Sequence, residues 1–107
     1  MLNNIFANIP AALPEELFET LFQKAGVHIE RIVSKGHATP EQEWYDQEGD
    51  EWVILLQGSA TLLFENGKCC HLMPGDYMLI PAHTRHRVSS THPTNESIWL
   101  AVHIHTQ

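Results

Sequence analysis

The sequence has few basic residues and few cysteines, and each shortage excludes a class of protein. Six Lys and Arg residues stand against thirteen Asp and Glu residues, which gives a formal charge of −7 at pH 7. Such a chain repels phosphate backbones and anionic lipid headgroups, so we expect no nucleic-acid partner and no membrane association. The two cysteines, Cys69 and Cys70, are adjacent, and neighbours on a strand point to opposite faces. They are poor disulfide partners, which favours a cytoplasmic protein.

Long apolar runs and a basic N-terminal leader are also missing. No apolar run approaches the length of a bilayer span, and MLNNIFANIPAALPEEL lacks the basic region of a secretory signal. Neither a Ser-His-Asp pattern nor a phosphate-binding loop is present. The apolar fraction of 43% is typical of a globular chain with room for one modest core. The unusual abundance is histidine, with eight residues among 107.

The sequence predicts one helix followed by strands. Pro14 and the acids after it suit the first turn of a helix, apolar residues then recur at helical spacing, and Gly26 is a natural stop. After Gly26 the pattern changes to short strand-like segments, over 27–34, 52–57, 60–64, 68–72, 77–80, 86–90 and 98–104. Asn66-Gly67 is a strong hairpin signal between the third and fourth of them. Short strands with frequent turns indicate an antiparallel sandwich or barrel.

Two short motifs give the chain a resemblance to a known family. Glu51 followed by six residues and Gly58 resembles the end of the first cupin motif, and GDYMLIPAHTRH (75–86) resembles the second. Their order and the hairpin between them are similar to those of a small single-domain cupin. The resemblance implies an all-β fold in which residues 27–107 form an antiparallel jelly-roll β-barrel. Together with the helix predicted above, this gives a barrel preceded by a short N-terminal helical arm over 1–26.

The same resemblance implies a metal site. In cupins a divalent metal is usually held by the two histidines of an HxH, a glutamate and a histidine of the second motif, and Glu51 and His86 match the last two. Counting back from Glu51 places Trp44 and Asp46 at the HxH positions, and His83 stands where the second motif normally has glycine. The implied ligands are Asp46, Glu51 and His86, with His83 as a possible fourth. The ion would be Zn, Fe, Mn or Ni.

Two interpretations of Glu51 and His86 remain open from the residues alone. Carboxylates that converge on an apolar interior need a compensating positive charge, which a metal would supply. Alternatively, Glu51 is paired with Arg85 or Arg87, and His86 is a hydrogen-bonded histidine of the interior.

Four further residues are candidates for a substrate pocket: Trp44, Tyr45, His37 and His103. Aromatic rings supply apolar walls, although Trp44 and Tyr45 point to opposite faces if their segment is extended. His37 could act as an acid or a base if its loop crosses the mouth of the barrel. His103 shares a face of the last strand with Trp99.

These features leave two classes of function. The first is a metal-dependent enzyme on a small molecule, such as a dioxygenase or an isomerase. The second is a metal-free protein that binds a small molecule as a carrier or sensor. In either class Trp52 and Ile54 face away from Glu51 on their strand, and this apolar face needs cover from the helix or from a second copy. We therefore expect a homodimer.

Overall fold

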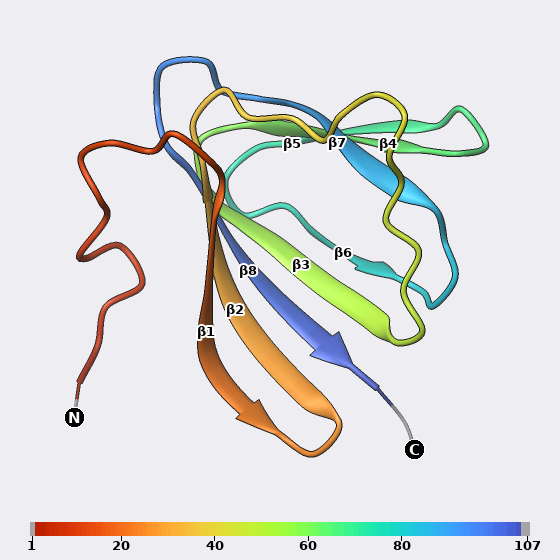
Figure 1. The fold of residues 1–107 in the computed structure, drawn as a ribbon, viewed down its shortest axis with the longest axis horizontal. Coiled ribbons are helices and arrows are strands. Elements are labelled where there is room, and N and C mark those ends of the chain that lie inside the picture. The colour runs from red at the N-terminus through yellow and green to blue at the C-terminus, as the bar shows by residue number, and fades with distance from the viewer. Residues whose placement is uncertain (1, 106–107) are drawn as a thin grey trace.

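The computed structural model describes residues 2–105, and its regular structure is entirely β (Figure 1). Its strands, in chain order, are β1 (Leu17–Lys24), β2 (Val27–Ser34), β3 (Asp50–Gln57), β4 (Ala60–Phe64), β5 (Cys69–Leu72), β6 (Tyr77–Ile80), β7 (His86–Thr91) and β8 (Ser97–Ile104). Over the described range there is no helix long and apolar enough to cross a membrane.

The strands form two antiparallel sheets. The larger has the order β1-β2-β8-β3-β6, and the smaller has the order β5-β4-β7. Figure 1 shows the two sheets facing each other at an angle, with the segment before β1 beside the edge of the larger sheet. The core lies between them and combines residues of both sheets, among them Val53, Leu62, Ile80 and Trp99.

Strand β3 shows how the sequence directs side chains to this core. Buried and partly exposed residues alternate along it, with Glu51, Val53 and Leu55 on the buried side. A strand places successive side chains on opposite faces, so Trp52 and Ile54 point outward. The expected division of β3 into two faces is confirmed.

The strands predicted between residues 27 and 104 are confirmed. The predictions over 27–34, 60–64 and 77–80 match β2, β4 and β6, and the other strands differ only at their ends. The Asn66-Gly67 hairpin is present as well. Gly67 has a φ of 92°, and the Phe64 amide donates to the Lys68 carbonyl at 2.8 Å.

The predicted N-terminal helix is wrong. Residues Leu17–Lys24 form β1, which pairs antiparallel with β2, from Leu17 opposite Val33 to Lys24 opposite Val27. Apolar pairs such as 17 with 21 and 18 with 22 fit helical spacing, but pairing with β2 satisfies the backbone of this segment. Gly26, with a φ of 80°, forms the tight turn of the β1–β2 hairpin instead of ending a helix.

The closed barrel is also wrong, although the jelly-roll arrangement of antiparallel strands is present. Between residues 2 and 105 no ladder of strand hydrogen bonds joins the two sheets. A single β-bridge among the described residues instead joins Tyr45, in the segment before β3, to His86, at the start of β7. This bridge positions the candidate site.

Candidate functional site

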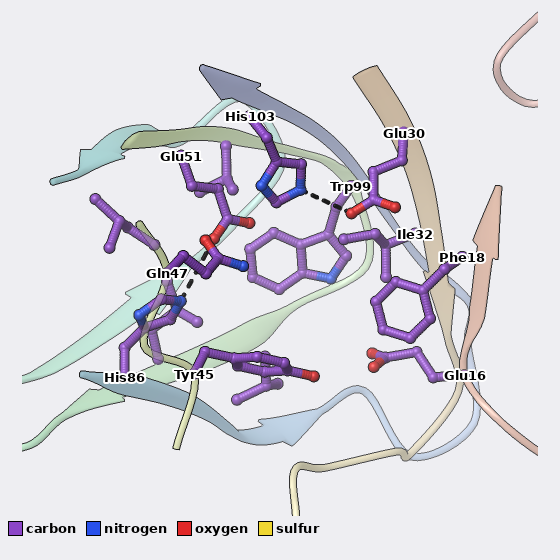
Figure 2. A pocket seen from close by; sticks show the side chains of 14 residues that line it. Glu16, Phe18, Glu30, Ile32, Tyr45, Gln47, Glu51, His86, Trp99 and His103 are labelled. Carbon is purple, nitrogen blue, oxygen red and sulfur yellow. Dashed lines mark hydrogen bonds and ion pairs between the residues drawn. The ribbon is translucent and has the colours of Figure 1, made fainter. Parts of the chain in front are cut away.

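The segment before β3 is fixed across one end of the space between the sheets. The Tyr45 amide donates to the His86 carbonyl at 2.8 Å, and the His86 amide donates back to the Tyr45 carbonyl at 3.1 Å. The His83 amide donates to the Gln47 carbonyl at 2.8 Å. These bonds bring residues 45–47 beside β7, which directs Tyr45 and Gln47 into the space that Glu51 and His86 also face (Figure 2).

Glu51 and His86 form a buried pair. Glu51 Oε1 and His86 Nε2 are 3.5 Å apart, and the two side chains are only 10% and 5% exposed. On the other side of the ring, His86 Nδ1 donates to the Thr84 carbonyl at 2.7 Å. Because Nδ1 is the donor to a carbonyl, a proton on Nε2 is the arrangement that stabilises the facing carboxylate.

The surroundings of His86 favour its charged form. Burial by itself lowers the pKa of His86, but Glu51 and the Thr84 carbonyl outweigh that effect, and the pKa is raised above its ordinary value. Two aromatic rings lie near the imidazole, with the centroids of Tyr45 and Phe64 at 5.6 Å and 6.1 Å. The protonated ring of His86 is therefore the form that the Glu51 carboxylate and the Thr84 carbonyl stabilise.

A second histidine–glutamate pair lies on the neighbouring strands. His103 is directly opposite Glu51 in the register of β8 and β3, and its Nε2 is 2.8 Å from Glu30 Oε1 on β2. The hydrogen bond to Glu30 outweighs burial and raises the pKa of His103. The His103–Glu30 pair therefore lies within the larger sheet, beside Glu51, whereas the Glu51–His86 pair joins the larger sheet to the smaller one.

Both pairs face one cavity, with a volume of about 130 Å³. Figure 2 shows the indole of Trp99 between the His103–Glu30 pair and Tyr45. The polar residues that line the cavity are Glu16, Glu30, Tyr45, Gln47, Glu51, His86 and His103. The apolar ones are Phe18, Ile32, Val53, Leu62, Ile80, Val88 and Trp99. Burial raises the pKa of Tyr45, and the charge of Glu16 raises it further, so the Tyr45 hydroxyl stays protonated.

The four residues expected to hold a metal fall into two separate pairs. Glu51 and His86 face the cavity, whereas Asp46 and His83 pair with each other at 3.2 Å, with side chains 47% and 67% exposed. Over residues 2–105 no group of three or more His, Cys, Asp or Glu side chains is placed to hold a metal ion. The donor set therefore does not fit the divalent metal that the resemblance implies, and the partner of Glu51 is His86.

The residues expected to line the pocket are divided as well. Tyr45 and His103 line the cavity. Trp44 lies outside the lining, with the Arg85 guanidinium 6.0 Å from its ring centroid. His37 is also outside, where its Nδ1 accepts a hydrogen bond from the Lys35 amide.

The alternative pairing of Glu51 with an arginine does not occur in the structure. Arg85 pairs with Glu65 at 2.6 Å, and Arg87 donates to the carbonyls of Thr39 and Glu41.

Ten residues of the lining are not among the site residues predicted from the sequence, and four of them show why: Gln47, Glu30, Glu16 and Phe18. Counting back from Glu51 to Trp44 and Asp46 passes over Gln47, whereas a spacing one residue shorter reaches Tyr45 and Gln47 together. Glu30 is identified only by the pairing of β2 with β8, which places it near His103. Glu16 and Phe18 were assigned to a helix, where they had no connection with the site.

Comparisons with known proteins agree with the fold. The family model of the cupin domain matches residues 30–103. A proposed mannose-6-phosphate isomerase from Ralstonia eutropha JMP134 is 41% identical, with a TM-score of 0.94 and coverage of 99% of each chain. A cupin superfamily protein from Desulfitobacterium hafniense DCB-2 is 23% identical, with a TM-score of 0.76, and covers 92% of this chain and 84% of its own. No curated protein matches the sequence.

Proposed function

The chain belongs to the cupin family, and we propose that it is an isomerase-type enzyme that moves a proton next to a carbonyl group of a small molecule, with Glu51 and His86 as its base and acid. The observation that carries the proposal is the buried Glu51–His86 pair, 3.5 Å apart at the wall of the cavity. Paired acid and base groups of this kind perform proton abstraction next to a carbonyl. The 41% identical relative from Ralstonia eutropha JMP134 has isomerase in its name, which supports the reaction type.

The two groups divide the proton transfers between them. The Glu51 carboxylate removes the proton from the carbon beside the carbonyl, while His86 donates its Nε2 proton to the carbonyl oxygen, which forms an enediol. Glu51 then returns its proton to the adjacent carbon, and His86 recovers a proton from the hydroxyl that becomes the new carbonyl. Both groups end as they began, so the cycle balances.

The other polar residues of the cavity bind and orient the substrate. The Tyr45 hydroxyl and the Gln47 amide can hydrogen-bond to substrate oxygens beside the Glu51–His86 pair. The bond from Nδ1 to the Thr84 carbonyl holds the His86 ring in place. Positioning of this kind contributes to the rate because the reacting atoms are held close together.

Deuterium exchange tests the proposal before the substrate is identified. A set of small α-hydroxy aldehydes and ketones would be incubated with the protein in D₂O, and exchange at the carbon beside the carbonyl would be followed by ¹H NMR. We expect exchange above the buffer rate for at least one compound. Glu51→Gln and His86→Asn should each lower the rate by about 100-fold or more, the usual contribution of a positioned acid or base.

The exposed pair provides matched controls. Asp46→Asn and His83→Asn make the same chemical changes outside the cavity, and both should leave the exchange rate unchanged. Asn is also suitable at position 83 because His83 has a φ of 59°, which Asn tolerates. Exchange that survives Glu51→Gln at the wild-type rate would rule out the assigned roles.

A second candidate is ligand binding without chemistry. It is favoured by Tyr45 and Gln47, which take the two cavity positions that metal-binding histidines would otherwise fill. A compound that binds in the cavity while none of the set exchanges deuterium would favour this candidate over the enzyme.

A further inference from the structure

The size of the cavity limits what it can hold. Its volume of about 130 Å³ is close to that of an engineered protein cavity of about 150 Å³ that binds benzene. A molecule of roughly six to eight non-hydrogen atoms fits that space. A hexose phosphate is much larger and would not be enclosed.

The charge of the lining is negative in every protonation state of its histidines. Three glutamates, Glu16, Glu30 and Glu51, line the cavity together with two histidines and no lysine or arginine. With both histidines protonated the five groups sum to −1, and with both neutral they sum to −3. No arginine side chain is available nearby, because Arg31, Arg85 and Arg87 are bonded elsewhere.

Glu16 is the lining carboxylate that has no histidine partner. It comes from the segment before β1, outside the residues 30–103 that match the cupin domain. The fully buried Ser34 hydroxyl donates to its carboxylate. Arg31, only 5% exposed, holds the preceding segment in place through the carbonyls of Ile5 and Ala7. The charge of Glu16 is therefore a fixed part of the wall.

The uncharged part of the cavity lining suits an apolar ligand that carries one oxygen acceptor. Ile32, Val53 and Leu62 contribute apolar walls, and aromatic rings complete them. Trp99 also lines the cavity, and its Nε1 is buried without a hydrogen-bond partner among the described residues. The hydrogen-bond donors that face the open space are the Tyr45 hydroxyl and the Gln47 amide, and either can donate to a ligand oxygen.

We infer that the cavity excludes anions, phosphorylated sugars included, and that Glu16 is the specificity residue for this exclusion; the ligand is a largely apolar molecule without negative charge, of roughly six to eight non-hydrogen atoms, that carries a carbonyl or hydroxyl oxygen. The inference deepens the proposed function, since it names the substrate class of the same site. The substrate class inferred for this chain also differs from the one in the name of its relative from Ralstonia eutropha JMP134, because mannose 6-phosphate is a phosphate ester.

Three probes test the inference by binding alone: 2-hydroxycyclohexanone, which is uncharged; cyclohexanecarboxylate, an anion of similar size; and D-mannose 6-phosphate. Each would be titrated into ¹⁵N-labelled protein while the indole signal of Trp99 and the amide signals of the cavity are recorded. We expect wild type to bind the uncharged probe at least about tenfold more tightly than either anion, given the surplus of negative charge around the ligand.

Glu16→Gln removes one negative charge and keeps the shape of the side chain. It should narrow the preference for the uncharged probe over cyclohexanecarboxylate by about fivefold or more. Glu15→Gln makes the same change at the neighbouring exposed residue and should leave the preference unchanged. The wild-type comparison stands even if Glu16→Gln fails to fold.

Equal or tighter binding of either anion by wild type would overturn the inference, and so would failure of wild type to bind 2-hydroxycyclohexanone. An unchanged preference in folded Glu16→Gln would overturn the role of Glu16. Deuterium exchange distinguishes these failures from failure of the proposed function. Selective binding of the uncharged probe without deuterium exchange would refute the isomerase-type activity and leave the substrate class standing. Deuterium exchange confined to phosphorylated compounds would refute the substrate class and leave the activity standing.

Discussion

Replacement of one member of the Glu51–His86 pair should destabilise the chain unequally, depending on which member remains. After His86→Asn, the Glu51 side chain is 10% exposed and has lost its cationic partner. The carboxylate must either stay charged in the cavity or take up a proton. At pH 7, protonation of a carboxyl with the ordinary pKa of about 4.3 costs about 4 kcal/mol, which sets the ceiling. We expect a loss of about 2–4 kcal/mol in the free energy of unfolding.

Glu51→Gln leaves His86 behind, and an imidazole can lose its charge cheaply. The ordinary pKa of histidine, about 6.5, is already below pH 7, so deprotonation costs almost nothing. The loss is then that of one buried polar interaction, about 1 kcal/mol. The exposed pair is the control, because Asp46→Asn and His83→Asn should each change stability by less than about 1 kcal/mol.

Urea unfolding at pH 7, followed by tryptophan fluorescence, measures all four variants against wild type. Equal losses for His86→Asn and Glu51→Gln would refute the reasoning, because they would show that Glu51 does not depend on His86 for its charge. Losses of the same size in the exposed pair would show that burial is not the cause.

Three further predictions concern stability and assembly. The pKa values of His86 and His103 are raised in the folded chain, so the stability that these two histidines contribute is complete below about pH 6.5 and is lost as the pH rises through their pKa values in the folded state. Thermal melts should show this loss of stability, and the loss should be smaller in Glu51→Gln. Leu55→Ala, at a fully buried position, should cost about 2–5 kcal/mol in urea unfolding, and a cost below about 1 kcal/mol would show that the core relaxes around the gap. The outer face of the larger sheet bears two exposed apolar side chains, Tyr77 and Leu79, at 65% and 52% exposure, and we expect a second copy of the chain to cover them. Light scattering should find a homodimer that Leu79→Asp dissociates, and a wild-type monomer at high micromolar concentration would contradict this prediction.

The strands between residues 27 and 104 could be predicted because their signals are local. Apolar runs bounded by turn residues determine β2, β4 and β6, and Asn66-Gly67 marks its hairpin without help from the rest of the chain. β1 could not be predicted, because its apolar residues fit helical spacing and its partner β2 is what decides the outcome.

The site could be predicted only in part for a similar reason. Glu51 and His86 stand in recognisable motifs, so they were found. Their relation to each other, a pair instead of two metal ligands, depends on the bridge between Tyr45 and His86. Glu16 and Glu30 reach the cavity from the segment before β1 and from β2, and their contribution becomes visible only once those segments are placed beside β8 and the smaller sheet.

The protonation of His86 tests the central claim most directly, since the proposed chemistry needs a proton on Nε2 facing Glu51. The ¹⁵N signals of the imidazole nitrogens would be followed against pH in wild type and in Glu51→Gln, first without added metal and then with Zn²⁺. We expect His86 to keep protons on both nitrogens to a higher pH in wild type than in Glu51→Gln, and we expect Zn²⁺ to leave its signals in place. Equal titration midpoints in the two proteins, or a Zn²⁺-induced shift of His86 Nε2 that disappears in Glu51→Gln, would contradict it.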